Sequence, residues 1–230
     1  MSGATVLSEN VSIGRRTRVG LIFDDGFVPS TLVTAKLFEE FRLPAVFAVL
    51  AEPGDFAPEF VKGDFGLWNE LQARGHIIQP HGLTHAKLSE LPHERATDEI
   101  ARCLDAFSER LRGFEPKRAV YCYAYNSATP QLNEWLRPRV RAFRQVGSGF
   151  LSDADLAAGF WHSDAIGPHD PGDELIAVLD RVRRERPPAF LFTLHGLDGE
   201  AWGAIALPKL RRVLEIITTD DALEYWPVGR

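Results

Sequence analysis

The sequence predicts an α/β protein built around a parallel sheet. Short apolar runs, among them residues 19–23, 44–50 and 189–194, have the length and composition of buried strands. Segments with apolar residues at helical spacing separate these runs, and such an alternation produces βα units with right-handed crossovers. Aspartates and histidines stand where several of the runs end. In folds of this class the carboxyl edge of the sheet carries the chemistry.

The elements can be placed in order along the first half of the chain. A helix begins near Pro29, a strand covers residues 44–50, and a short helix over 67–74 ends at Gly75. The next strand runs into His81. Between the second strand and the short helix, residues 52–66 are rich in Pro, Gly and Asp. This loop fits either a plain connection or a lid or binding loop.

The second half continues the alternation. The longest helix is expected at 92–112, with an apolar stripe at helical spacing formed by Ile100, Leu104, Phe107 and Leu111. The remaining expected elements are strands at 119–123, 140–146, 160–166 and 189–194, and helices at 130–137, 175–182 and 210–217.

Composition excludes several classes of protein. A chain of 230 residues can bury one large core, so we expect a single domain over residues 1–230 with an N-terminal extension at 1–17. The net charge of −6 and the lack of a basic run argue against a nucleic-acid partner. No apolar segment has the length of a membrane span, and Arg15-Arg16 precedes no signal core, so a cytoplasmic location is expected. Cys103 and Cys122 are expected to be reduced and buried.

His81 and His85 are spaced for a shared metal ion. One helical turn would place both rings on one face, and two imidazoles with one carboxylate form a three-ligand site that leaves a position open for water. The same spacing also occurs in surface and core histidines. The carboxylate pair at the end of one other strand and the third histidine at the end of a further strand favour the metal site.

The pair Asp24-Asp25 and the single His195 suggest acid–base chemistry. Adjacent residues leaving a strand point in opposite directions, so one aspartate can bind the metal while the other acts as a general base. A solvated Asp-Gly turn is the plain alternative. His195 could protonate a leaving amine, or it could be a loop or core histidine. Together these groups predict hydrolysis of an amide at a bound metal.

The same motifs resemble those of a known family. Phe23-Asp24-Asp25-Gly26, the segment His81–His85 and His195 closing an apolar strand resemble the NodB-homology polysaccharide deacetylases (carbohydrate esterase family 4). The resemblance extends roughly over residues 18–226. It implies a distorted (β/α) barrel of about seven parallel strands, with the site at their carboxyl ends.

The resemblance also implies roles for these residues. Asp24 would be the catalytic base, His195 the catalytic acid, and Asp25, His81 and His85 the ligands of one divalent ion. Zinc is favoured, with cobalt, nickel and manganese as alternatives. The implied enzyme is a metal-dependent hydrolase that removes an N-acyl group, N-acetyl above all, from an amino sugar or saccharide precursor in surface-polysaccharide biosynthesis.

The third motif of the family is altered in this chain. Segment 122–126 lacks the arginine that often steadies the base aspartate. Tyr125 stands at the tyrosine whose backbone N–H helps to bind the oxyanion, and Tyr123 and Asn126 flank it as substrate-binding candidates. The resemblance further suggests Trp161 for the acyl pocket and Asp164 for orienting the acid histidine.

Two other functions stay open at this point. One is a deformylase or small-amide hydrolase on the same scaffold. The other is a degenerate domain that binds glycan without catalysis, although a domain of this kind would be expected to lose Asp24 or His195. The acyl group, the sugar, the metal and the oligomeric state are not decided by the sequence.

Overall fold

The fold is taken from a computed structural model that describes residues 15–230, so residues 1–14 of the expected extension lie outside the described part. The larger sheet has the order β3-β2-β1-β8-β6, and β9 also pairs with β1. All its pairs are parallel except β6 with β8. Its strands are β1 (Thr17–Phe23), β2 (Val46–Val49), β3 (Ile77–Pro80), β6 (Phe150–Leu151), β8 (Ala189–Leu194) and β9 (Leu223–Tyr225).

A second, smaller sheet completes a distorted barrel. It contains β4 (Val120–Cys122), β5 (Ala142–Val146) and β7 (Phe160–Ser163), all parallel. An isolated parallel bridge between Asp164 and Phe192 joins β7 to β8. Where β3 faces β4, the side-chain Oε1 of Gln79 accepts a hydrogen bond from the Val120 backbone N–H at 2.8 Å. Seven parallel strands, with β9 added beside β1 as an eighth, therefore form the distorted barrel, as the resemblance implied.

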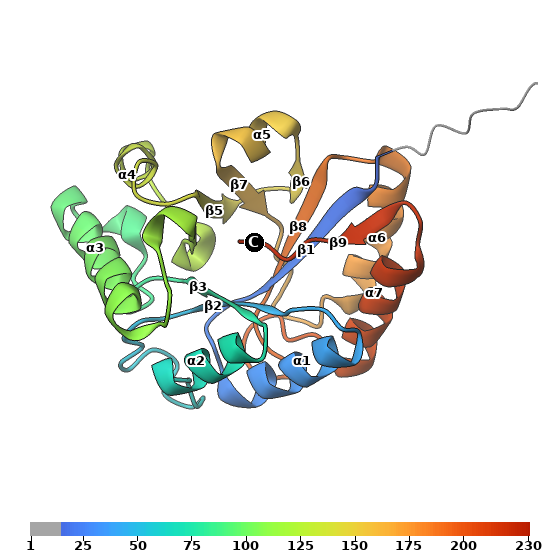
Figure 1. The fold of residues 1–230 in the computed structure, drawn as a ribbon, viewed down its shortest axis with the longest axis horizontal. Coiled ribbons are helices and arrows are strands. Elements are labelled where there is room, and N and C mark those ends of the chain that lie inside the picture. The colour runs from blue at the N-terminus through green and yellow to red at the C-terminus, as the bar shows by residue number, and fades with distance from the viewer. Residues whose placement is uncertain (1–14) are drawn as a thin grey trace, which may run out of the picture.

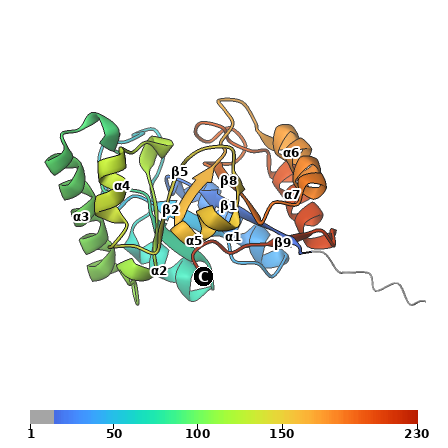
Figure 2. The ribbon, with the colours of Figure 1, turned by 90° about the horizontal axis from the view of Figure 1, so that it is seen from above.

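Helices cover the outside of the strands, as the two perpendicular views show (Figures 1 and 2). They are α1 (Val28–Glu40), α2 (Phe65–Ala73), α3 (His93–Arg110), α4 (Pro130–Leu136), α5 (Asp153–Ala158), α6 (Gly172–Glu185) and α7 (Leu207–Thr219), with short 3-10 turns at Leu88–Glu90, Pro116–Arg118 and Ala124–Asn126.

The expected stripe of α3 is buried, with all four of its residues at most 6% exposed. Expected helices and strands match the observed ones within a few residues, except that β6, α5 and β9 were not expected. These elements have two, six and three residues, too few for a periodic pattern to show.

The amino end of the barrel is closed by the C-terminal segment. Trp226 and Val228 are buried, and a Cβ on Gly20 would lie only 2.6 Å from Val228. Trp161 of β7 packs edge-on against Trp226, with ring centroids 5.0 Å apart. Because this end is filled, the carboxyl ends of the strands are left for the functional site.

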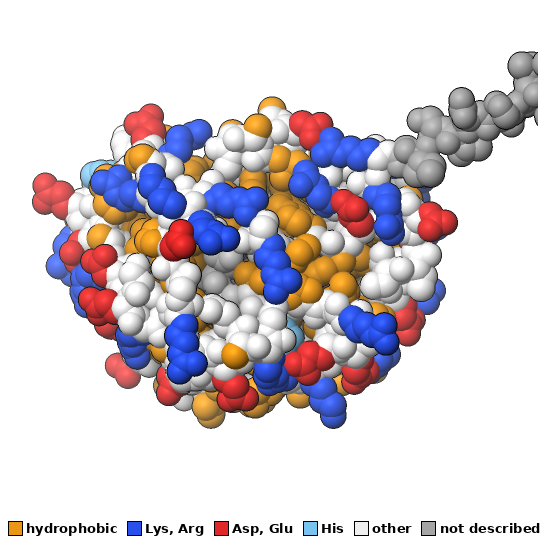
Figure 3. Space-filling view, in the orientation of Figure 1, with side chains coloured by type: hydrophobic (Ala, Val, Ile, Leu, Met, Phe, Trp, Pro, Cys, Tyr) orange, Lys and Arg blue, Asp and Glu red, His pale blue; other side chains and the backbone are white. Residues whose placement is uncertain are grey.

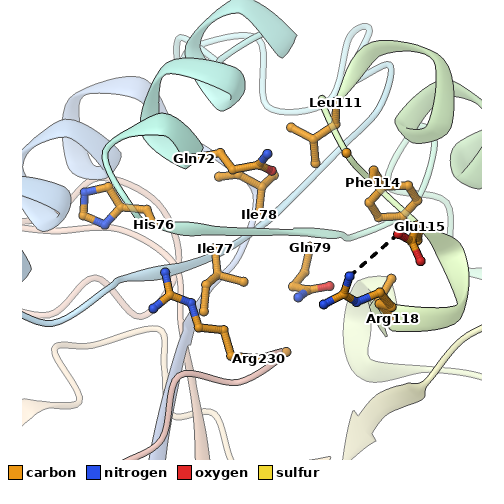
Figure 4. A pocket seen from close by; sticks show the side chains of 13 residues that line it. Gln72, His76, Ile77, Ile78, Gln79, Leu111, Phe114, Glu115, Arg118 and Arg230 are labelled. Atoms are coloured by element: carbon orange, nitrogen blue, oxygen red, sulfur yellow. Dashed lines mark ion pairs between the residues drawn. The ribbon is translucent and has the colours of Figure 1, made fainter.

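A small cavity of about 290 Å³ lies at the start of β3, beside the C-terminal segment (Figure 4). Gln79, Arg118 and Arg230 line it, and Arg118 forms an ion pair with Glu115 at 3.7 Å.

In the space-filling view, Lys and Arg side chains surround a hydrophobic area on the face toward the viewer (Figure 3). The net negative charge is therefore spread unevenly over the surface. Among residues 15–230, no helix has both the length and the apolar character that a bilayer crossing requires.

Candidate active site

The register of β1 and β8 brings Asp24 and His195 together. Phe23 is paired with Leu194, and the Asp24 N–H donates to the Leu194 carbonyl at 2.8 Å. The next residue of each strand, Asp24 and His195, therefore leaves the sheet at the same height. Both side chains line one cleft at the carboxyl end of the barrel.

The turn after β1 separates the two aspartates. Asp25 and Gly26 both have left-handed backbones, with φ of 73° and 74°. Glycine adopts this conformation without strain, and aspartate tolerates it better than most residues. A Cβ on Gly26 would also lie 2.9 Å from the Trp68 ring. The tight turn is thus possible because residue 26 has no side chain.

His81 and His85 converge, but not on a helical turn as expected. His81 follows β3, and its N–H donates to the Val49 carbonyl at 2.9 Å. The chain then turns irregularly, with φ of 110° at Gly82 and 66° at His85. This correction has a physical reason, because Gly82 opens a left-handed conformation that a helix cannot contain.

Asp25, His81 and His85 form a site that fits a divalent metal. Their ligand atoms all lie within 4.8 Å of one another. Asp25 Oδ1 is 3.3 Å from His81 Nε2 and 3.2 Å from His85 Nε2, although this buried oxygen has no hydrogen-bond donor. Ligands bound 2.0–2.2 Å from one tetrahedral zinc would be roughly 3.3 Å apart. The three residues therefore suit a bound divalent metal, because no hydrogen bond among them satisfies the buried Asp25 oxygen.

The second nitrogen of His81 is held in the orientation that a ligand needs. Nδ1 lies 2.9 Å from the Cys122 carbonyl oxygen, so it must carry the proton and donate. This leaves the lone pair of Nε2 facing Asp25.

The charges of the site also favour a cation. Burial opposes ionisation of Asp25, but the close approach of the His81 and His85 imidazoles outweighs it and keeps the Asp25 pKa below its ordinary value. Burial likewise disfavours charged His81, yet Asp24 and Asp25 outweigh it and raise the His81 pKa. The raised His81 pKa reports the negative potential of two buried carboxylates, which would attract a positive ion.

The Asp24 carboxylate is paired with an arginine that no motif in the sequence indicated. Arg144 of β5 is fully buried and donates to Asp24 Oδ2 at 2.7 Å. It also donates to the hydroxyls of Ser163 and Thr193, on β7 and β8. Burial favours neutral guanidine, but the Asp24 charge outweighs it and raises the Arg144 pKa, so the side chain stays charged. The only sequence signal was the presence of two arginines, Arg141 and Arg144, inside the expected strand 140–146.

His195 has an aromatic neighbour and no carboxylate partner among the described residues. Its ring packs edge-on against Trp202, with centroids 5.2 Å apart. The expected partner Asp164 instead accepts a hydrogen bond from the Ala165 N–H at 2.9 Å. Burial lowers the His195 pKa, and the more weakly acting charges of Asp25 and Asp24 do not restore it.

The substrate-binding candidates divide into two groups. Tyr125 and Asn126 line the cleft, with left-handed backbones of φ 54° and 49°. Tyr123 and Trp161 need correction, because neither lines it. Tyr123 is buried against Tyr121 and Phe143, and Trp161 lies in the closed amino half beside Trp226. Trp161 belongs to β7 and Tyr123 directly follows β4, and each side chain points into the packed interior, a direction that the motif alone did not show.

The cleft has a volume of about 570 Å³, and Asp25, His81 and His85 are part of its lining. The loop 52–66 supplies one of its walls through Phe56, Ala57, Glu59 and Phe60. Phe56 stacks on the His85 ring, with centroids 3.8 Å apart. The loop is therefore part of the site rather than a plain connection.

The sequence model for the family described as polysaccharide deacetylase matches residues 13–138, more than half of the chain. The chain belongs to the polysaccharide deacetylase family. This membership places it among the carbohydrate deacetylases, enzymes that act on carbon–nitrogen bonds. No curated protein gives a significant match.

Solved structures of deacetylases share the fold. A family 4 carbohydrate esterase from Streptomyces lividans, in complex with acetate, is 19% identical with a TM-score of 0.58, covering 93% of this chain and 96% of that one. The catalytic domain of a peptidoglycan N-acetylglucosamine deacetylase from Eubacterium rectale is 14% identical with a TM-score of 0.57, covering 94% and 91%. A peptidoglycan deacetylase from Bacillus subtilis is 19% identical with a TM-score of 0.54, covering 92% and 86%. At these identities the similarity establishes the fold.

Proposed function

We propose that this member of the polysaccharide deacetylase family is a metal-dependent hydrolase that removes an N-acyl group, N-acetyl above all, from an amino sugar. The observation that carries the proposal is that the two adjacent aspartates face different groups of side chains. Asp25 faces His81 and His85, whereas Asp24 faces Arg144 and stands beside His195.

A divalent ion held by Asp25, His81 and His85 would polarise the acyl carbonyl and lower the pKa of water. Zinc remains the favoured ion. Asp24 then removes the proton of the attacking water, and Arg144 keeps this carboxylate in place and ionised. The backbone N–H of Tyr125 stabilises the negative charge that develops on the acyl oxygen.

His195 donates a proton to the departing amine in this scheme. Because burial lowers its pKa, the imidazole is uncharged near neutral pH in the resting protein. It must therefore gain a proton during the reaction, and Asp24 at the neighbouring strand end is the group that holds one after it has deprotonated the water that attacks the acyl carbon.

The test separates the two aspartates by metal content and turnover. In Asp24→Asn the bound zinc should stay at the wild-type level while amine release from N-acetylglucosamine oligomers falls about 10²–10⁴-fold. The matched variant Asp25→Asn should lose zinc as well as turnover, as elemental analysis of the dialysed proteins would show. Loss of zinc from Asp24→Asn, with zinc retained in Asp25→Asn, would reverse the assignment and contradict the proposal.

A deformylase on the same scaffold is the alternative enzyme. Parallel assays with N-formyl and N-acetyl substrates distinguish the two, because a deformylase should prefer the formyl amide. A cytoplasmic location and a role in surface-polysaccharide biosynthesis remain predictions from the sequence.

A further inference from the structure

Beyond the metal-binding residues, the cleft is walled by aromatic side chains. On one side Phe56 covers His85 and Phe60 packs edge-on against Phe27, with ring centroids 5.0 Å apart. On another side Trp202 stands next to His195. A group bound beside the reacting amide would therefore contact ring faces and edges.

The mouth of the cleft exposes apolar surface to water. Val146, Tyr125 and Trp202 are 71%, 59% and 47% exposed, and all three line the cleft. Isolated exposed apolar residues are ordinary, but a group gathered around a concave site marks a surface that is covered when a ligand binds.

The lining lacks a positive side chain among the described residues. Its charged groups other than histidine are the carboxylates Asp24, Asp25 and Glu59. Arg144 is buried behind the cleft and already paired with Asp24. Lys62, the cation nearest in sequence to the aromatic wall, donates to the backbone carbonyls of Phe56 and Ala57. A phosphate or carboxylate on a substrate would thus find no cationic side chain among the described lining residues, and only the divalent ion itself could compensate its charge.

We propose that the substrate is a short, uncharged N-acyl glycoside whose aglycone is apolar. This inference rests on the proposed function. The aryl or alkyl group would lie between the phenylalanine wall and Trp202, while the acyl amide reaches the metal-binding residues. A volume of about 570 Å³ is that of a site for one small ligand. Nucleotide-linked and phosphorylated N-acyl sugars would be poor substrates, because no cationic side chain of the described lining can pair with their phosphates.

The experiment measures amine release by the zinc-loaded full chain from four probes. These are phenyl N-acetyl-β-glucosaminide, free N-acetylglucosamine, N,N′-diacetylchitobiose and N-acetylglucosamine 1-phosphate. We expect kcat/KM for the phenyl glycoside to exceed that for the free sugar and the disaccharide about tenfold, mainly through a lower KM, as for about 55 Å² of newly buried apolar area. The sugar phosphate should be the poorest substrate. Preference for the disaccharide or the phosphate would overturn the inference.

Two variants locate the aglycone. Trp202→Ala and Phe60→Ala should each lower the ratio of kcat/KM between the phenyl glycoside and the free sugar toward one. Leu32→Ala, an equally apolar change on the exposed face of α1 outside the cleft, should leave the ratio unchanged. An unchanged ratio in both cleft variants would contradict the assigned position.

Calorimetric titration of Asp24→Asn with the same probes keeps this inference separate from the proposed function. About tenfold tighter binding of the phenyl glycoside than of the free sugar supports the apolar site even when no probe is hydrolysed, an outcome that refutes only the hydrolase. Turnover without that preference refutes only the apolar aglycone. If no probe is hydrolysed and the phenyl glycoside binds no tighter than the free sugar, both the hydrolase and the apolar aglycone are refuted.

Discussion

Asp24 and Asp25 are neighbours in sequence, yet the structure gives them different main partners, although His81 Nε2 lies 3.6 Å from Asp24 and 3.3 Å from Asp25. The left-handed backbone at Asp25 turns its carboxylate toward His81 and His85, while Asp24 stays in line with β1 and meets Arg144. A strained backbone at a non-glycine residue is held only where its surroundings over-determine it. Here the strain coincides with the separation of the proposed metal ligand, Asp25, from the proposed base, Asp24.

Arg144 is expected to act as a positioning residue for Asp24. Arg144→Met should lower kcat about 10²-fold with KM and zinc content close to wild type, because the base loses its fixed orientation. It should also lower the free energy of unfolding by about 3–5 kcal/mol, since Asp24 is left buried without a partner. Steady-state kinetics and urea unfolding measure these effects.

Arg144→Lys provides the matched control, because it keeps the charge but loses the planar fork of donors. It should restore part of kcat relative to the methionine variant. Equal kcat in the wild type and Arg144→Met would show that Asp24 needs no such support.

At the scale of elements, the loop 52–66 is part of the cleft because several contacts attach it to the turn after β1. Val28 donates to the Val61 carbonyl at 2.8 Å, and Gly63 donates to the Gly26 carbonyl at 3.0 Å. Lys62 holds the loop from within through its bonds to Phe56 and Ala57. The aromatic wall is therefore carried by a well-anchored loop.

Lys62→Met should loosen this wall without touching the metal-binding residues. The loss of two charge-assisted hydrogen bonds should raise KM about five- to tenfold while kcat changes little. Lys87→Met is the control, because Lys87 is exposed and, within residues 15–230, pairs only with Glu90. A fall in kcat with unchanged KM would indicate that the loop positions the reacting groups instead.

His76 links the start of β3 to β2 and makes stability depend on pH. Its Nδ1 accepts a hydrogen bond from the Ala45 N–H at 3.1 Å, so the ring is neutral, with Nε2 toward Glu39. Burial lowers the His76 pKa below its ordinary value of 6.5, although Glu39 opposes the shift. The unfolded chain therefore binds more protons than the folded one as the pH falls through 6.5.

We expect this contribution to be complete above pH 6.5 and to be lost as the pH falls from there toward the lowered pKa. The free energy of unfolding in urea, measured at several pH values between 7.5 and 5, should fall more steeply for the wild type than for His76→Gln. The glutamine can still accept from Ala45 but does not titrate. Parallel pH curves for the two proteins would rule out His76 as the cause.

At the scale of the whole molecule, the barrel is closed partly by side chains. No backbone ladder joins β3 to β4 in the described chain, and Gln79 provides the hydrogen bond that the Val120 N–H needs. Gln79 is 4% exposed and lies at the wall of the small cavity in Figure 4. A buried amide without this acceptor would remain unsatisfied.

Gln79→Leu should lower the free energy of unfolding by about 1–3 kcal/mol, the cost of leaving the Val120 N–H buried without an acceptor. Gln72→Leu, in the same cavity but with its side chain bonded to the exposed Arg112 carbonyl, should change it by less than about 0.5 kcal/mol. Thermal unfolding monitored by circular dichroism compares the two variants. Similar losses would mean that the junction of β3 and β4 needs no side-chain bridge.

The sequence by itself determined the alternation of strands and helices and the residues at strand ends. Local patterns carry this information, because burial of a strand and of one helix face each impose a period on the apolar residues. Asp25, His81 and His85 could therefore be named before any coordinates, and the structure brings them together.

Only the tertiary structure decided which distant residues support that group. Arg144 reaches Asp24 because β5 faces β1 across the barrel, a relation with no signal in the local sequence. Trp202 rather than Trp161 reaches the cleft, because the loop after β8 returns over His195 while β7 points Trp161 into the closed half. Contacts across a barrel depend on strand order and register, and these are set by the packing of the whole chain.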